Sequence, residues 1–242
     1  MLFTILLAAA AILAGAIAAV TGFGVGSVLT PVFALKTGTK LAVAAVAIPH
    51  FVATAQRFWI LRRHVNRRVL LGFGVASALG GLGGAFAHTR VSSRGLSFVF
   101  GILLLTAALA ELTGWMQKVH WGWRAAWAAG ALSGALGGLV GNQGSVRTAA
   151  LLGFHVPKDS FVATATAIAL FVDGARLPVY LATQWDQLVT LWPLVLSATV
   201  GGVIGTAFGA RALERVPQRL FRRIVALVLM LLGFYMLVFG GA

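Results

Sequence analysis

Apolar runs of roughly twenty residues recur along almost the whole chain, separated by short basic loops. A helix needs about 20 apolar residues to cross the ~30 Å hydrocarbon layer of a bilayer. The last run carries no charge from Ile224 to Ala242. The pattern therefore predicts an all-α integral membrane protein with about eight full transmembrane helices. The long runs cover 2–20, 41–60, 69–87 and 96–113, then 123–140, 160–182, 187–209 and 222–240.

Two further apolar segments, 22–35 and 141–154, follow Gly-rich interruptions and are shorter than the others. A helix of about 14 residues reaches only ~21 Å at 1.5 Å per residue. We therefore expect each of them to be a discontinuous or re-entrant helix. The sequence leaves open whether they cross the membrane or turn back.

The two halves of the chain resemble each other. Gly26–Thr30 and Gly144–Thr148 differ only in having Leu29 or Arg147 at the fourth position. Such self-similarity predicts an internal repeat, with repeat 1 at about 1–114 and repeat 2 at about 122–242 of a single membrane domain, 1–242. Further matches pair Gly15 and Gly22 with Gly134 and Gly141, Gly80, Gly81 and Gly84 with Gly201, Gly202 and Gly205, and Arg90 and Arg94 with Arg215 and Arg219.

Many of the 30 glycines stand four residues apart. In lipid, close backbone contact through small residues supplies the attraction between helices. We therefore assign a packing role to these glycines, which are Gly80 and Gly84, Gly130, Gly134 and Gly138, and Gly201, Gly205 and Gly209.

The loop charges favour inverted repeats. If each short segment counts as a crossing, most loop Lys and Arg residues share one side, and only Lys36, Lys40, Arg90 and Arg94 lie opposite. If the short segments re-enter and the repeats are parallel, the split is nearly even. Cytoplasmic loops carry the excess of Lys and Arg. The inverted arrangement therefore predicts a multi-pass protein of the cytoplasmic (inner) membrane with both termini outside.

Composition removes several classes of function. The chain is 60% hydrophobic and 10% charged, far from a soluble enzyme. Its net charge of +14 lies in membrane loops, so we expect no nucleic-acid partner. No cysteine is present, and His64, His88, His120 and His155 are expected in loops without metal-ligand spacing. We expect no metal and no cofactor.

The two Gly-rich interruptions predict an anion site. Paired breaks in corresponding places mark the midplane site of a transporter, and the N-terminus of a half-helix attracts anions. Arg147 at that depth would cost roughly 2.5–3.5 kcal/mol, which a bound anion would offset. A structural salt bridge or a snorkelling side chain is the alternative. The predicted substrate-binding residues are Gly22, Gly24, Gly26, Ser27, Gly141, Asn142, Gln143, Gly144, Ser145 and Arg147.

Five further polar residues are candidates for charge pairing or proton coupling. Asp173 and Arg176 lie three apart and so share a helix face. One interpretation is that the two charges neutralise each other. The alternatives are that Asp173 pairs with Arg147, or that it binds and releases a proton to couple transport to protons. His50 is a proton carrier or a hydrogen-bonded core residue. Gln56 and Arg57 occupy a similar place in the first half, although Arg57 also reads as the end of the basic loop.

The residues Gly22, Gly24, Gly26 and Pro31 resemble the glycine-rich first signature of the TauE/SafE anion permeases, the sulfite exporter family. Val25 replaces a middle glycine. The second half resembles the second signature through Gly134, Gly138, Gly141 and Gly144, but it has Ala149 and Ala150 where the family has proline. The resemblance implies transport of small sulfur-containing anions such as sulfite or organosulfonates.

The residues themselves indicate a secondary transporter of a small oxyanion working by alternating access, since there is no Walker motif for ATP. A passive anion channel would share the same site. An intramembrane lipid-phosphate hydrolase is a weaker rival, because such chemistry needs a set of base and nucleophile. The expected partners are the anion and the lipid bilayer, and homo-oligomerisation stays open.

Overall fold

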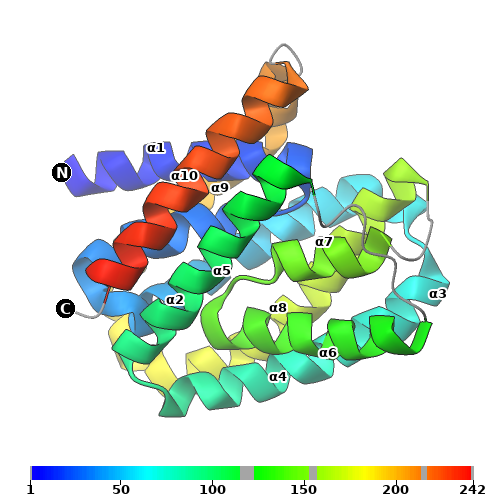
Figure 1. Cartoon of the computed structure of the whole chain (residues 1–242). Helices are drawn as coiled ribbons and strands as arrows, with labels where there is room; N and C mark the ends of the chain where they lie inside the picture. Colours follow the sequence, from blue (N-terminus) through cyan, green and yellow to red (C-terminus); the bar gives the residue numbers. More distant parts are fainter. Residues whose placement is uncertain (1, 115–122, 153–156, 214–216, 241–242) are drawn as a thin grey trace.

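The computed structural model describes residues 2–114, 123–152, 157–213 and 217–240, and every element in these parts is helical (Figure 1). The first half contains α1 (Leu2–Thr21), α2 (Val25–Leu61), the 3₁₀ turn η1 (Arg62–His64), α3 (Arg67–Val69), the π turn η2 (Leu70–Gly74), α4 (Val75–Arg90) and α5 (Ser93–Thr113). The second half contains α6 (Trp123–Val140), α7 (Gly144–Leu152), α8 (Lys158–Thr190), α9 (Trp192–Leu213) and α10 (Gln218–Val238).

Seven helical stretches of the described residues are long and apolar enough to span a membrane, which makes the chain a multi-pass membrane protein. The run at 123–140, expected as one of eight full spans, corresponds to α6 and contributes the shorter apolar stretch Trp127–Val140. The seven stretches are Leu2–Thr21, Val25–His64, Arg67–Arg90, Ser93–Thr113, Ser160–Thr190, Trp192–Gly209 and Arg219–Val238.

The two short segments take different forms. The second is the separate helix α7, whereas the first forms the opening part of α2. That helix breaks at Gly38, which has φ 73° and ψ 159°. Such a positive φ suits glycine because it has no Cβ. The long helix α8 is likewise interrupted, at Gln184.

Helices of one half pack mainly against helices of the other. The largest contacts join α1 with α9, α4 with α6 and α5 with α10, followed equally by α2 with α8 and α4 with α8. Glycine brings two of these pairs together: a Cβ on Gly84 or Gly138 would collide with backbone across the α4–α6 contact, and one on Gly205 would meet Ile12 backbone on α1. These close backbone contacts confirm the predicted packing role of the glycines. In lipid, where the hydrophobic effect does not drive helices together, such contacts supply the attraction between them.

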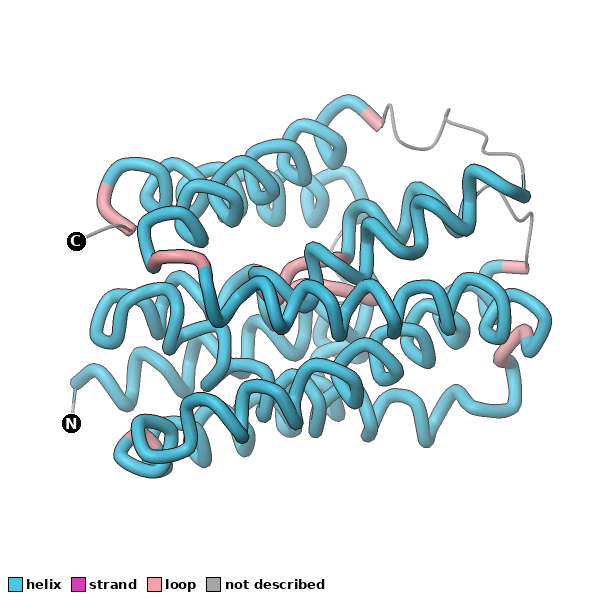
Figure 2. Tube along the Cα trace, turned by 90° about the horizontal axis from the view of Figure 1, so that it is seen from below, coloured by secondary structure: helices cyan, strands magenta, loops and turns pink. Residues whose placement is uncertain are grey.

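The N-terminal end of α1 and the C-terminal end of α10 lie at the same end of the molecule (Figures 1 and 2), here called the terminal face. The Gly38 bend lies there too, since the Lys40 amide donates to Ser93 Oγ at 3.0 Å and Thr39 Oγ1 donates to the Gly240 carbonyl at 3.1 Å. Away from the terminal face, Figure 1 shows α3 at the right and the start of α10 at the top. We call these parts, together with η1, the basic face, because they hold Arg62, Arg63, Arg67, Arg68, Arg219, Arg222 and Arg223.

Candidate functional site

The two Gly-rich interruptions meet inside the bundle. Gly22 and Gly24 precede α2 with φ of 81° and 129°, and Gly141 precedes α7 with φ of 75°. A Cβ on Gly26 would strike the Gly141 carbonyl, and one on Gly144 would strike the Phe23 side chain. Only glycine allows these contacts. The structure therefore brings the predicted glycines of both halves into one place.

Both following helices begin at this junction. The first bond of the α2 ladder runs from the Val28 amide to the Gly24 carbonyl at 3.0 Å, and that of α7 runs from the Arg147 amide to the Gln143 carbonyl, also at 3.0 Å. The preceding amides, at 25–27 and 144–146, therefore lie outside the helical ladders. Each helix start contributes a partial positive charge to the junction.

Arg57 lies at the first break and is only 6% exposed. Its Nη1 donates to the Ala18 carbonyl, its Nη2 to the Gly22 carbonyl at 3.3 Å, and its Nε to Thr166 Oγ1 at 3.0 Å. The reading of Arg57 as the end of the basic loop is therefore wrong. The guanidinium instead turns inward to the carbonyls that end α1, where a helix is partly negative.

Arg147 reaches the same break from α7. Its Nη2 donates to the Gly22 carbonyl at 3.2 Å, whereas its Nε and Nη1 are buried without a partner. The side chain is 2% exposed, so it does not snorkel. It forms no salt bridge with a described carboxylate. The Nε and Nη1 groups of this buried guanidinium are therefore available as hydrogen-bond donors to a ligand.

Other polar atoms predicted for the site are also buried and unpartnered. They include the Asn142 Nδ2, the Gln143 Oε1 and the Gln56 Oε1. An unpaired buried polar group is costly, so each such atom indicates a missing partner. Ser27 is buried at the start of α2, and the Ser145 side chain lies outside the described residues.

Asp173 pairs with Arg176 and His50 rather than with Arg147. Arg176 donates to Asp173 Oδ1 through Nε at 3.0 Å and Nη2 at 2.8 Å, and His50 Nδ1 lies 2.6 Å from Asp173 Oδ2. The expectation of mutual neutralisation between Asp173 and Arg176 is confirmed. The proposed Asp173–Arg147 pair is wrong, because both carboxylate oxygens already bind these other groups.

Three side chains satisfy the last carbonyls of α6 at the second break. Arg176 Nη1 donates to the Gly137 carbonyl at 2.8 Å, the Tyr180 hydroxyl donates to Gly138, and His88 Nδ1 donates to Leu139 at 2.8 Å. Tyr180 was not among the predicted site residues, although it follows Arg176 by four residues on the same helix face. His88 was expected in a loop, whereas α4 extends to Arg90 and buries this ring completely.

The buried charge at the junction is positive. Among the described residues, three arginines are buried there, Arg57, Arg147 and Arg176, with Asp173 as their buried carboxylate. The described part contains no group of three His, Asp or Glu residues that could hold a metal ion. The arrangement therefore presents cationic and amide donors and suits an anion.

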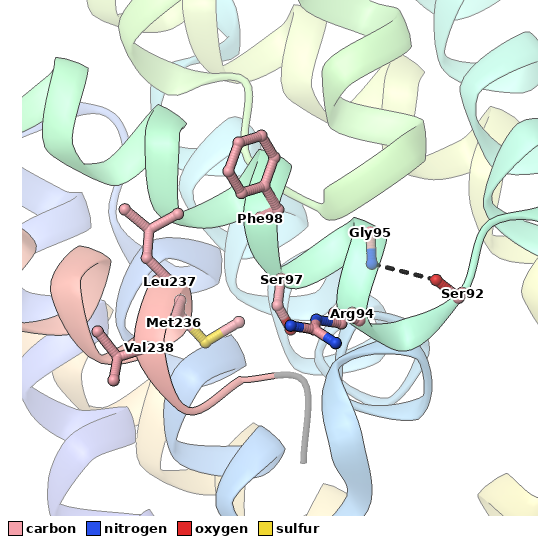
Figure 3. Close-up of a pocket in the computed structure, with 8 residues that line it drawn as sticks. All are labelled: Ser92, Arg94, Gly95, Ser97, Phe98, Met236, Leu237 and Val238. Atoms are coloured by element: carbon pink, nitrogen blue, oxygen red, sulfur yellow. Dashed lines mark hydrogen bonds between the residues drawn. The ribbon is translucent and has the colours of Figure 1, made fainter.

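A separate cavity of about 660 Å³ lies between α5 and α10 on the terminal face, where Figure 3 shows Arg94 and Ser97 beside Met236. The Ser92 hydroxyl caps α5 there by accepting from the Gly95 amide at 3.2 Å. None of the residues that line this cavity belongs to either Gly-rich interruption, so the cavity is not part of the candidate site.

Comparison with known proteins agrees with this geometry. The sequence model of the sulfite exporter TauE/SafE family matches residues 7–236, nearly the whole chain. Searches of curated proteins and of solved structures gave no significant match. The chain belongs to the sulfite exporter TauE/SafE family, and it is therefore a membrane transporter of sulfur-containing anions rather than an enzyme.

Proposed function

We propose that the protein carries a small sulfur oxyanion, such as sulfite or an organosulfonate, through a site between the two helix breaks. The observation that carries this proposal is Arg147, which is buried to 2% and has Nε and Nη1 unpartnered. A guanidinium presents a planar pair of donors that matches an oxyanion. A bound anion would satisfy both donors and offset the cost of burying the charge.

Further residues complete the proposed site. Asn142 Nδ2 would donate to the anion, and Arg57 would add positive charge from the other side of the Gly22 carbonyl. The N-terminal amides of α2 and α7, at Gly24, Gly26 and Ser27 and at Gly144 and Ser145, would supply neutral donors. The unpartnered oxygens of Gln56 and Gln143 would accept a hydrogen bond from a protonated anion.

Protons are the proposed coupling ion. His50 is bonded to Asp173, and its ring lies beside Gly26, since a Cβ there would be 3.9 Å from His50 Cδ2. Protonation of His50 would add positive charge next to the site without breaking the Asp173–Arg176 pair. The anion and the proton would then bind together.

Alternating access would come from two inverted repeats, at about 1–114 and 122–242. The reciprocal pairing of helices between the halves supports this proposal. The basic face would lie toward the cytoplasm, in accord with the positive-inside tendency, and both termini outside. A passive channel fits less well, because Asn142, Gln143 and Arg147 are all buried, as expected for a site that is closed off between steps of transport.

Flux into proteoliposomes tests the function. Sulfite, thiosulfate, sulfoacetate, sulfate, nitrate and acetate would be compared, with and without a pH gradient. We expect saturable flux of a sulfur oxyanion, and an Arg147→Gln variant to lose about 100-fold, equivalent to roughly 2.8 kcal/mol. Arg63→Gln, which removes an exposed charge from η1, is the matched control and should stay within about twofold.

Two results would contradict the proposal. Unchanged flux in a folded Arg147→Gln variant would remove the site assignment. Failure of the folded native protein to move any sulfur oxyanion would remove the proposed function.

A further inference from the structure

A polar cavity of about 380 Å³ opens at the terminal face, away from both helix breaks. Threonines, glutamines and one lysine form most of its wall, and Lys40 is the charged residue among them. Its Nζ donates to the Thr89 carbonyl at 2.6 Å, which holds the cation at the wall. The full lining is Thr37, Lys40, Leu41, Thr89, Thr183, Gln184 and Gln187.

A stripe of polar side chains on α8 joins this cavity to the central site. Residues spaced three or four apart share one face of a helix. The stripe starts at Asp173 beside the breaks and ends at Gln187 in the cavity wall. Polar residues inside a membrane helix are costly unless they serve the protein interior. Its members are Asp173, Arg176, Tyr180, Gln184 and Gln187.

The middle of this stripe is closed. Gln184 Nε2 lies 3.4 Å from His88 Nε2, and the His88 and Tyr180 rings pack with centroids 4.9 Å apart. His88 and Tyr180 are both completely buried. Beyond them Arg176 lies against Gly141, where a Cβ would be 3.2 Å from Arg176 Nη1. A plug of two rings and one amide therefore separates the cavity from the helix breaks.

One contact of the plug is weaker than the others. His88 Nδ1 donates to the Leu139 carbonyl at 2.8 Å, whereas the contact between His88 Nε2 and Gln184 Nε2 is long, at 3.4 Å. Gln184 is also the residue at which α8 is interrupted, with φ of −133° and ψ of 19°. Gln184 therefore lies at the kink between the two parts of α8.

We propose that this cavity is the terminal-face vestibule for the sulfur oxyanion, and that His88, Tyr180 and Gln184 form the gate between it and the central site. The inference rests on the proposed function. Lys40 attracts the anion, the hydroxyls and amides replace part of its hydration shell, and displacement of Gln184 from His88 opens the way to Arg176.

Single-cysteine variants test the vestibule, because the native chain contains no cysteine. Thr183→Cys and Gln187→Cys would place a thiol in the cavity wall, and Asp186→Cys would place one on the same turn of α8 at a residue that does not line the cavity. Each purified variant would be treated with an anionic (iodoacetate) or a cationic (2-bromoethylamine) alkylating reagent, freed of reagent and assayed for sulfite flux, because sulfite does not cleave the thioethers that these reagents form. Each variant before treatment serves as its own reference.

We expect the anionic adduct at Thr183→Cys or Gln187→Cys to lower flux about tenfold, and the cationic adduct to lower it less, because like charge repels the anion from a confined cavity. Both adducts at Asp186→Cys should leave flux within about twofold. Equal effects at all three positions, or no difference between the two charges, would overturn the vestibule. If the native protein, without any reagent, shows no sulfite flux, the proposed function itself would be rejected.

Discussion

The two helix breaks are built alike but carry different charges. Each break is preceded by a helix whose carbonyl four residues before the glycine accepts two bonds. Ala18 accepts from the Gly22 amide at 2.9 Å and from Arg57. Gly137 accepts from the Gly141 amide at 2.9 Å and from Arg176. An arginine thus satisfies the end of the broken helix in both halves.

The difference lies in what neutralises each arginine. Arg176 pairs with Asp173 three residues before it, whereas the residue three before Arg57 is Thr54. Arg147 also points to the first break, and its counterpart in the first half is Leu29. Positive charge therefore collects at the first break while the second is neutralised. The comparison suggests that the second break supports the fold and the first attracts the anion.

Removal of the carboxylate should have the largest effect. We expect Asp173→Asn to lower the free energy of unfolding by ~3–5 kcal/mol, because Arg176 is left buried without its counter-charge. Asp173→Asn with Arg176→Gln should recover part of that loss. Thermal denaturation of the purified protein in detergent measures both variants. A single variant as stable as the native protein would show that the second break does not need its ion pair.

A substitution that pushes the two helix breaks apart should have the next largest effect on the free energy of unfolding. Gly26→Ala puts a methyl group against the Gly141 carbonyl, and we expect a loss of ~1–3 kcal/mol in unfolding free energy. Gly22→Ala meets no atom within 4 Å and only strains a φ of 81°, which should cost about 1 kcal/mol. Denaturation midpoints compare the two. Equal losses would indicate that the breaks do not pack tightly.

Charge removal at the first break should affect transport more than folding. Arg57→Gln leaves no carboxylate unpaired, so we expect a folded protein whose KM for sulfite rises about tenfold. Arg176→Gln should instead destabilise the protein, although by less than Asp173→Asn, because Asp173 loses its arginine but keeps its bond to His50. Flux kinetics and size-exclusion profiles give the two readouts. An unchanged KM in Arg57→Gln would place the anion elsewhere.

The smallest effect is expected from one hydroxyl group. Tyr180→Phe removes the donor to the Gly138 carbonyl and should lower the free energy of unfolding by about 1 kcal/mol. Tyr235→Phe on α10 is the control, since its ring stacks on Phe239 and phenylalanine keeps that contact. Equal stability of the two variants would show that Tyr180 does not stabilise the end of α6.

Hydropathy placed most of the helices, because lipid forces each spanning segment to satisfy its own backbone. The breaks were predictable for the same reason, since glycine and polar residues interrupt otherwise apolar stretches at Gly22–Gly24 and Gly141–Gln143. Hydropathy misplaced the boundary between α8 and α9, since α8 continues to Thr190 beyond the run predicted at 160–182. It also did not show that the two short segments differ, the first being joined to the next helix as part of α2 and the second forming the separate helix α7. The difference depends on one backbone conformation at Gly38.

The sequence by itself determined the membrane class, the helix-packing glycines, the two breaks and the residue types that suit an anion. Only the tertiary structure decided which cations serve which break. Arg57 looked like a loop residue because it stands five residues before Arg62, yet its guanidinium reaches the carbonyls of Ala18 and Gly22. His88 and Tyr180 became partners of α6 through contacts between distant segments. Periodicity along a chain reports which face of a helix is polar, whereas the partner of a buried charge depends on how helices from opposite halves cross.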